Sequence, residues 1–231
     1  MPDLRPGPLA LSKRLITRVR ARGPREVWGL GAARIREFVG SNEQLTFYVR
    51  PAEGGPEERP QKWEGLELET AGPEHGRVYA ERIGTDSPTT FRGRLAEHTR
   101  CYLVVHEATI VHASWVTTAG AWVREVRRFF RPPPGDAYVY ESFTRAEARG
   151  KGVYPFALVY ICERLATEGS RRVWVGVEES NEASKRSVSK AGFEPGFRVS
   201  YGRRMGILKF DPPVVLGDEK CPDCLVRTIR I

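Results

Sequence analysis

Residues 140–154 have the sequence YESFTRAEARGKGVY and are the most informative part of the chain. This stretch ends a strand-like run over 137–144 and leads into an apolar helical pattern over 156–167. The segment Arg149–Gly152 (RGKG) stands where the helix should begin. The first N–H groups of a helix lack intrahelical partners, and the helix dipole adds partial positive charge there. Because glycines allow close approach and Arg and Lys add full charges, the stretch predicts a phosphate or pyrophosphate cradle.

A second informative segment follows a strand-like run at 172–178: residues 181–193, with the sequence NEASKRSVSKAGF. Asn181 is a favourable N-cap for a helix over 182–190, and Gly192 stands where a helix C-terminal glycine belongs. From residue 137 onward the predicted order is therefore strand, helix, strand, helix, strand. The first two strands are expected to be parallel, with a right-handed crossover.

Together the two segments resemble the GNAT superfamily of acyl-CoA-dependent N-acyltransferases. The family's pyrophosphate loop has Arg or Gln, then Gly three positions on and Gly or Ala after two more; Arg149 and Gly152 match it, and Tyr154 matches imperfectly. The family's next signature is matched by Asn181, Ser184, Lys190, Gly192 and Phe193. The likeness covers about residues 91–210. It implies a mixed α/β (α+β) fold, with a central mixed sheet of six to seven strands whose parallel strands four and five splay apart between flanking helices.

The resemblance also implies acetyl-CoA as co-substrate, with no metal. The main chain of Ser142, Phe143 and Thr144 would pair with pantetheine like an extra strand, and Asn181 would contact pantetheine or a bridging water. A main-chain N–H near the strand would polarise the thioester carbonyl. The cofactor-binding residues would further include Arg149, Gly150, Lys151, Gly152, Val153, Tyr154, Ser184 and Ser187.

The catalytic residues are less well defined by the sequence. Many relatives carry a tyrosine seven residues after the asparagine, as the acid for the leaving thiolate, whereas this chain has Val188. Ser184, Ser187 and Tyr201 are substitutes, and water is an alternative because CoA thiolate is a good leaving group. For a base, Glu141 is the leading candidate, provided that a bulge turns its side chain toward the cleft. The other candidate bases are His106 and His112.

The rest of the chain gives coarser expectations. We expect a strand over 45–50, a polar connection over 51–62, a hairpin formed by 102–105 and 109–116, a glycine-rich loop with a short helical piece and a proline stop over 117–136, and one or two strands over 197–210. Residues 1–40 form a basic helical arm, 41–210 the acyltransferase domain and 211–231 a tail with the Cys221–Cys224 pair (CPDC). That pair lacks the partners of a zinc site and is interpreted as incidental, with a metal site or an intermolecular contact as the alternatives.

Composition sets the broad class of the protein. The chain has 231 residues, of which 40% are hydrophobic, so it can bury a sizeable core. Residues 1–40 carry a charge of +6 out of a total of +8. No apolar run is long enough to span a membrane, and no secretory signal or disulfide framework is apparent, so we expect a cytoplasmic protein. The arm either packs on its own domain or docks on an anionic membrane, with nucleic acid the weaker alternative.

The sequence therefore favours an N-acetyltransferase that moves an acetyl group from acetyl-CoA to a primary amine by direct attack. Its expected partners are acyl-CoA and an amine acceptor, and a homodimer is also considered. The alternative is an acyl-CoA-binding regulatory or scaffolding module without turnover.

Overall fold

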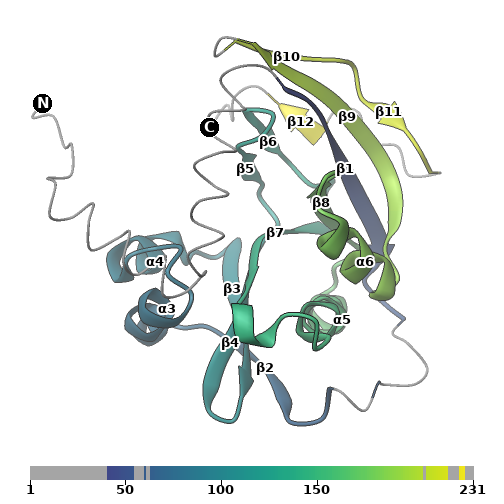
Figure 1. Cartoon of the computed structure of the whole chain (residues 1–231). Coiled ribbons are helices and arrows are strands. Elements are labelled where there is room, and N and C mark those ends of the chain that lie inside the picture. Colours follow the sequence, from purple (N-terminus) through teal and green to yellow (C-terminus); the bar gives the residue numbers. More distant parts are fainter. Residues whose placement is uncertain (1–40, 55–59, 61–62, 205–206, 218–223, 227–231) are drawn as a thin grey trace, which may run out of the picture.

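The computed structural model describes residues 41–54, 60, 63–204, 207–217 and 224–226 (Figure 1). Its strands are β1 (Ser41–Pro51), β2 (Leu66–Thr70), β3 (Thr99–His106), β4 (Thr109–Thr117), β5 (Ala121–Val123), β6 (Arg128–Phe130), β7 (Asp136–Thr144), β8 (Arg172–Glu178), β9 (Glu194–Arg204), β10 (Ile207–Phe210), β11 (Val214–Val215) and β12 (Leu225–Val226). Its helices are α3 (Gly76–Arg82), α4 (Pro88–Arg94), α5 (Val153–Thr167) and α6 (Glu182–Lys190), with 3₁₀ turns η2 (Pro73–His75) and η3 (Ala146–Ala148).

The described strands form a nine-stranded main sheet and a three-stranded sheet. The main sheet has the order β10-β9-β1-β8-β7-β4-β3-β2, and β11 adds to β9. Its paired strands are antiparallel except β7 and β8, which are parallel and are joined through α5. The sheet is thus mixed, as expected, but wider than six to seven strands. Part of the extra width comes from β11, which lies within the predicted tail.

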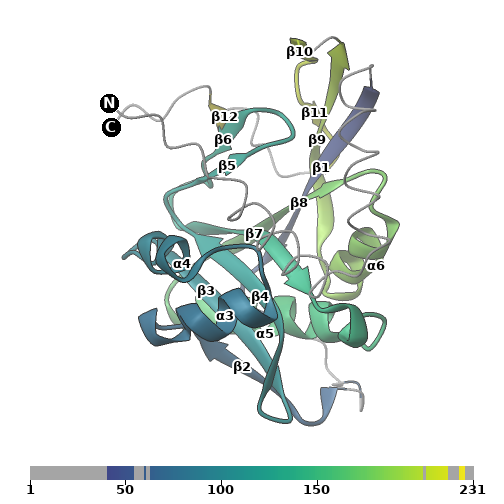
Figure 2. The ribbon, with the colours of Figure 1, turned by 60° about the vertical axis from the view of Figure 1, so that its left-hand side comes forward.

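Helices cover both faces of the main sheet. Figures 1 and 2 show α3 and α4 on one side of β3 and β4, and α5 on the other. Leu103 and Val104 are successive residues of β3 and so point to opposite faces. Leu103 belongs to a buried cluster with Phe91 of α4, whereas Val104 belongs to one with Phe156 of α5. The sheet is therefore buried between two separate apolar layers around β4 and β7.

The elements around the two motifs are largely as predicted. The strand at 172–178 and the helix at 182–190 have the expected bounds, β7 contains the expected strand, and β3 and β4 form the expected hairpin. The turn of that hairpin has positive φ at Glu107 and Ala108, the conformation typical of a two-residue hairpin loop. Helix α5 begins three residues earlier than its apolar pattern indicates, because Pro155 is compatible with a first helical turn.

The prediction of a short helical piece within 117–136 is wrong. This segment forms the β5–β6 hairpin, whose second strand, β6, lies between β5 and β12 and pairs with both. Phe130 of β6 stacks on Phe47 of β1 with a ring distance of 4.7 Å, and both are fully buried. The small sheet thereby covers the β1–β8–β9 part of the main sheet, and this distant packing decides the conformation of the hairpin.

The structure bears only in part on three further predictions, which concern the basic arm, the Cys221–Cys224 pair and membrane-spanning segments. The basic arm over 1–40 and Cys221 lie outside the described residues, and Cys224 is buried beside β6. Among the described residues, no helix is both long enough and apolar enough to cross a membrane.

Candidate active site

The parallel strands β7 and β8 separate halfway along their length. They pair from Asp136–Val139 to Arg172–Val175, and the pairing stops there. Beyond this point β7 continues beside β4 as far as Thr144, whereas β8 continues beside β1 as far as Glu178. The expected splay of these two strands is therefore confirmed, and it opens one edge of β7 toward the gap.

A β-bulge lies at the point of separation. The register between β4 and β7 shifts between Ala113 and Trp115, so that Glu141 and Ser142 together oppose Ser114. Glu141 has a φ of +48°, which is rare for a residue with a Cβ. The extra residue changes the side-chain alternation along β7. Ser142 therefore faces the α5 layer, and Phe143 is buried in the α3–α4 layer.

The main chain that follows the bulge is directed into the gap. The Arg145 N–H donates to the Val111 carbonyl on β4 at 2.9 Å. Because alternate residues of a strand direct their N–H and C=O groups to opposite sides, Thr144 and Ser142 direct theirs away from β4. The Thr144 carbonyl accepts from Arg149 Nε at 3.0 Å. The Phe143 main chain, by the same alternation, is directed to β4. Of the three expected pairing residues, Ser142 and Thr144 thus have the suitable direction.

Helix α5 begins close to the end of β7. Its N-cap Gly152 has a φ of +80° and Gly150 a φ of +76°, so both glycines hold left-handed conformations that L side chains rarely adopt. A Cβ added at Gly150 would meet no atom within 4 Å, so glycine is needed there for its backbone conformation. Lys151 is exposed beside these glycines, whereas Arg149 turns back to β7. The helix start combines unpartnered N–H groups, a dipole and a cation, as anion binding requires.

Helix α6 has the predicted caps. The Asn181 side chain accepts from the Ser184 N–H at 3.1 Å, and Gly192 has a φ of +80° just after the helix. The Ser187 hydroxyl donates to the Ala183 carbonyl of its own helix. Val188 is fully buried. The side chains of Asn181 and Ser187 therefore already have partners within α6, and position 188 offers no proton donor.

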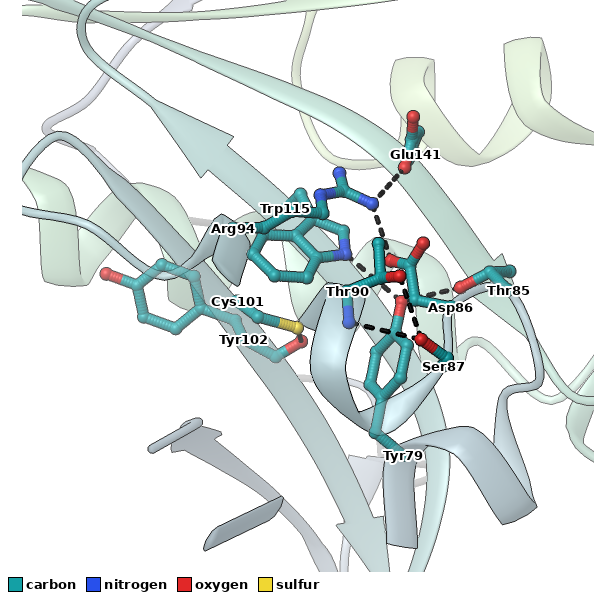
Figure 3. Close-up of polar contacts among 10 residues, drawn as sticks. All are labelled: Tyr79, Thr85, Asp86, Ser87, Thr90, Arg94, Cys101, Tyr102, Trp115 and Glu141. Carbon is teal, nitrogen blue, oxygen red and sulfur yellow. Dashed lines mark hydrogen bonds and ion pairs between the residues drawn. The ribbon is translucent and has the colours of Figure 1, made fainter. Parts of the chain in front are cut away.

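Glu141 lies on the α3–α4 side of the bulge and forms an ion pair there (Figure 3). Arg94 Nη1 is 2.6 Å from Glu141 Oε2 and 2.6 Å from Asp86 Oδ2. The guanidinium lies over the Trp115 ring, 3.9 Å from its centroid. The Glu141 side chain remains 55% exposed, so its carboxylate is fixed at one end and still open to solvent.

Two tyrosines lie on the same side of the sheet as Glu141. Tyr79 accepts a hydrogen bond from Trp115 Nε1 at 3.1 Å, which fixes α3 on β4 (Figure 3). The Tyr201 hydroxyl lies 2.9 Å from Glu43 and 3.0 Å from Glu178, the last residue of β8. Burial, followed by these two carboxylates, raises the pKa of Tyr201. Its proton is therefore held by carboxylates and is costly to release to a leaving group.

The two candidate histidines have different environments. His106 is exposed at the end of β3, beside the hairpin turn. His112 is fully buried, and burial lowers its pKa to about 3. Both ring nitrogens of His112 have hydroxyl partners, Thr144 and Ser114. A neutral imidazole that is closed to solvent is a poor proton acceptor for a substrate, so the structure does not support His112 as the base.

Two residues at the site, Ser114 and Arg94, were not predicted from the sequence. Ser114 and Arg94 received no role, although each contacts a residue of the bulge. Polar His112 and Ser114 alternate within the otherwise apolar run 110–116, which is a detectable signal for a polar cluster on one face of a strand. Arg94 gave no comparable signal, because its partner Glu141 is distant in sequence.

Comparisons with known proteins give matches at the level of structure only. No protein-family model matches the sequence, and no curated protein matches it. A GCN5-related N-acetyltransferase from Sphaerobacter thermophilus is similar with a TM-score of 0.50 at 17% identity, over 82% of this chain and 58% of that one. A functionally unknown conserved protein from Staphylococcus epidermidis is similar with a TM-score of 0.51 at 11% identity, over 77% of this chain and 66% of that one.

The first of these likenesses identifies the fold. The described residues have the mixed α+β fold of a GCN5-related N-acetyltransferase, as the two motifs predicted. The chain spans 58% of the length of the Sphaerobacter protein.

Proposed function

We propose that this protein binds acyl-CoA and transfers its acyl group to a primary amine. The observation that carries the proposal is the separation of β7 and β8, which opens a strand edge beside the start of α5. A ligand that combines an extended chain of amides with a pyrophosphate fits these two features together. Acetyl-CoA is the simplest ligand of this class.

The chain's own residues supply the contacts for such a ligand. The N–H groups of residues 150–154 would hold the pyrophosphate, with Lys151 adding positive charge. The main-chain groups of Ser142 and Thr144 that face the gap would pair with the amides of pantetheine. Arg149, which donates to the Thr144 carbonyl, joins the strand end to the helix start rather than acting only as a phosphate ligand. Asn181, Ser184 and Ser187 would lie beside the gap at the start of α6.

The reaction needs positioning more than it needs a protein nucleophile. The bound thioester supplies an activated acyl group that an amine can attack directly. A main-chain N–H after the bulge would donate to the thioester carbonyl, and one such donor typically lowers the barrier by about 2.7 to 4 kcal/mol. Holding the amine against the acyl carbon supplies much of the remaining rate.

Glu141 is the proposed base for the acceptor amine. It lies on the face opposite α5, where an amine could approach the gap, and Arg94 fixes its carboxylate. It would take the amine proton directly or through a water, and water would protonate the leaving thiolate. Tyr201, Ser184 and Ser187 are the alternative acids, of which Tyr201 is disfavoured by its two carboxylate partners and Ser187 by its bond to the Ala183 carbonyl.

Removal of this carboxylate tests the assignment. We expect Glu141→Gln to lower kcat about 100-fold without changing the acetyl-CoA affinity, because general-base catalysis contributes at least that much. Glu147→Gln is the matched control, because Glu147 is also exposed and paired with an arginine, Arg145. Equal rates for both variants would exclude Glu141 as the base.

The proposed binding site is tested with two glycines of α5. Gly150 and Gly169 flank opposite ends of the helix, both have positive φ, and a Cβ on either meets no atom within 4 Å. Gly150→Glu and Gly169→Glu therefore introduce the same charge and the same backbone strain. Calorimetry should show acetyl-CoA affinity reduced about tenfold or more by Gly150→Glu alone, because its carboxylate opposes the pyrophosphate. Equal affinity of both variants, or no binding by the wild-type protein, would contradict the proposal.

A binding module without turnover is the second candidate function. It is favoured by the buried Val188 and by Tyr201, whose hydroxyl is held by two carboxylates, because neither supplies a readily released proton. Thiol release from acetyl-CoA across a panel of primary amines separates the two functions. Release with any amine supports the transferase, and binding without release from any amine supports the module.

A further inference from the structure

A chain of buried and half-buried polar groups crosses the α5 layer beneath the bulge. His112 Nδ1 lies 2.7 Å from Thr144 Oγ1, and His112 Nε2 lies 2.8 Å from Ser114 Oγ. Ser114 Oγ lies 2.7 Å from Ser142 Oγ. His112 and Ser114 are fully buried within the otherwise apolar strand β4, so they need these hydrogen bonds to be stable there.

Tyr154 extends this chain into helix α5. Its ring stacks on His112 with centroids 5.4 Å apart and an interplanar angle of 29°. Burial raises the pKa of Tyr154 to about 12, against which a hydrogen bond with Ser142 acts. We call the five residues Thr144, His112, Ser114, Ser142 and Tyr154 the His112 network.

The protonation state of His112 gives the network its order. The pKa of His112 is lowered to about 3 by burial, so the ring is neutral and has one N–H donor and one acceptor nitrogen. Each hydroxyl between His112 and Tyr154 can donate once and accept at the same time. The network can therefore run in either of two directions, set by the His112 tautomer, and in each direction every link has one donor and one acceptor.

The network holds the part of β7 that faces the gap. Ser142 and Thr144 flank Phe143, and they are the two residues whose main chain is directed away from β4. On the opposite face, Arg94 holds the bulged residue Glu141. A residue with strained backbone persists only where its surroundings fix it, and the bulge is fixed here from both faces.

We propose that the His112 network is a positioning element, which aligns the main chain of Ser142 and Thr144 with the start of α5 so that one ligand can contact both. Tyr154 is the connecting residue, because it belongs to the first turn of α5 and its ring stacks on His112, the centre of the network. This inference rests on the proposed binding of acyl-CoA. It assigns to His112, Ser114 and Tyr154 a role in orienting the strand, without direct participation in the reaction.

The test compares a whole ligand with a fragment of it. Acetyl-CoA needs both the strand and the helix start, whereas its 3′-phosphorylated ADP fragment, which lacks pantetheine, needs only the helix start. Tyr154→Phe removes one hydroxyl and keeps the ring stacked on His112. Tyr160→Phe is the matched control on the same helix, with a ring that packs on Phe156 and Trp63 away from the network.

Calorimetry should show that Tyr154→Phe weakens acetyl-CoA binding about five- to tenfold and leaves fragment binding within about twofold. Ser142→Ala should give the same pattern, with Ser142→Thr restoring affinity, and thermal unfolding will confirm that each variant is folded. Unchanged acetyl-CoA affinity, or an equal loss for both ligands, would overturn the positioning role alone. Wild-type protein that binds neither ligand would overturn the proposed function and this inference with it.

Discussion

The two faces of the bulge are stabilised by opposite means. On the α5 face, neutral hydroxyls and an imidazole form a buried chain around Ser142. On the α3–α4 face, Arg94 pairs with Asp86 and with Glu141, a carboxylate that is more than half exposed. The strength of hydrogen bonds between neutral buried groups depends little on salt concentration or on pH above ~7. The attraction within partly exposed ion pairs, in contrast, is weakened by dissolved salt. The first face therefore provides rigidity, and the second provides a charge that remains accessible to solvent.

Removal of the imidazole should produce the largest loss of stability. His112→Phe keeps a ring against Tyr154 and leaves the Thr144 and Ser114 hydroxyls without their shared partner. Because the buried Ser114 hydroxyl keeps only Ser142 as a partner, the half-exposed Thr144 hydroxyl loses His112, and losing a partner costs a buried hydroxyl about 1 to 3 kcal/mol, we expect the free energy of unfolding to fall by about 2 to 3 kcal/mol. Urea denaturation measures it. A loss below about 0.5 kcal/mol would show that the network contributes little to the fold.

Lowering the pH should weaken the same face by a smaller amount. The pKa of His112 is about 3 in the folded protein and about 6.5 when unfolded, so the unfolded state takes up a proton first as the pH falls. Above pH ~6.5 His112 therefore does not change the free energy of unfolding. Between pH ~6.5 and ~3 it lowers the free energy of unfolding by up to about 1.4 kcal/mol per pH unit.

His112→Gln is the control for this pH effect, because an amide can donate and accept a hydrogen bond but does not titrate in this range. Between pH ~7 and ~5, the wild-type protein should lose about 2 kcal/mol more than the variant. Parallel losses in urea denaturation would mean that His112 is not buried in its neutral form.

The charged face should show the smallest effect and the strongest dependence on salt. Arg94→Met keeps most of the contact with Trp115 and removes the ion pairs with Asp86 and Glu141. We expect a loss of about 1 kcal/mol at low ionic strength, which shrinks in ~1 M NaCl as the charges are screened. Urea denaturation at the two salt concentrations measures the difference. A loss that is independent of salt would mean that this face, like the His112 network, is stabilised by contacts that salt does not screen.

The motifs were predictable because their requirements are local. The left-handed glycines at 150 and 152, the Asn181 cap and the Gly192 turn follow from a few neighbouring residues, and the structure has all of them. The parallel pair β7–β8 likewise follows from the order of the elements.

The bulge and its two supporting clusters were not predictable in this way. A bulge depends on how many residues one strand sets against another, and Ser114 opposes Glu141 and Ser142 only through the β4–β7 register. A short helical piece was expected where the β5–β6 hairpin lies, because β12, which pairs with Phe130 through Leu225, is distant in sequence. Sequence patterns thus predict the proposed ligand site but not what holds the strand in position.

Hydrogen exchange with and without acetyl-CoA shows directly whether acyl-CoA binds in the gap between β7 and β8. We predict slower amide exchange at residues 142–144 and 150–154, with no change in the β5–β6 hairpin over 121–130. Protection confined to another region, such as the groove that β2 and α5 form around Leu66, Leu68 and Tyr160, would contradict the claim that the gap between β7 and β8 is the acyl-CoA site.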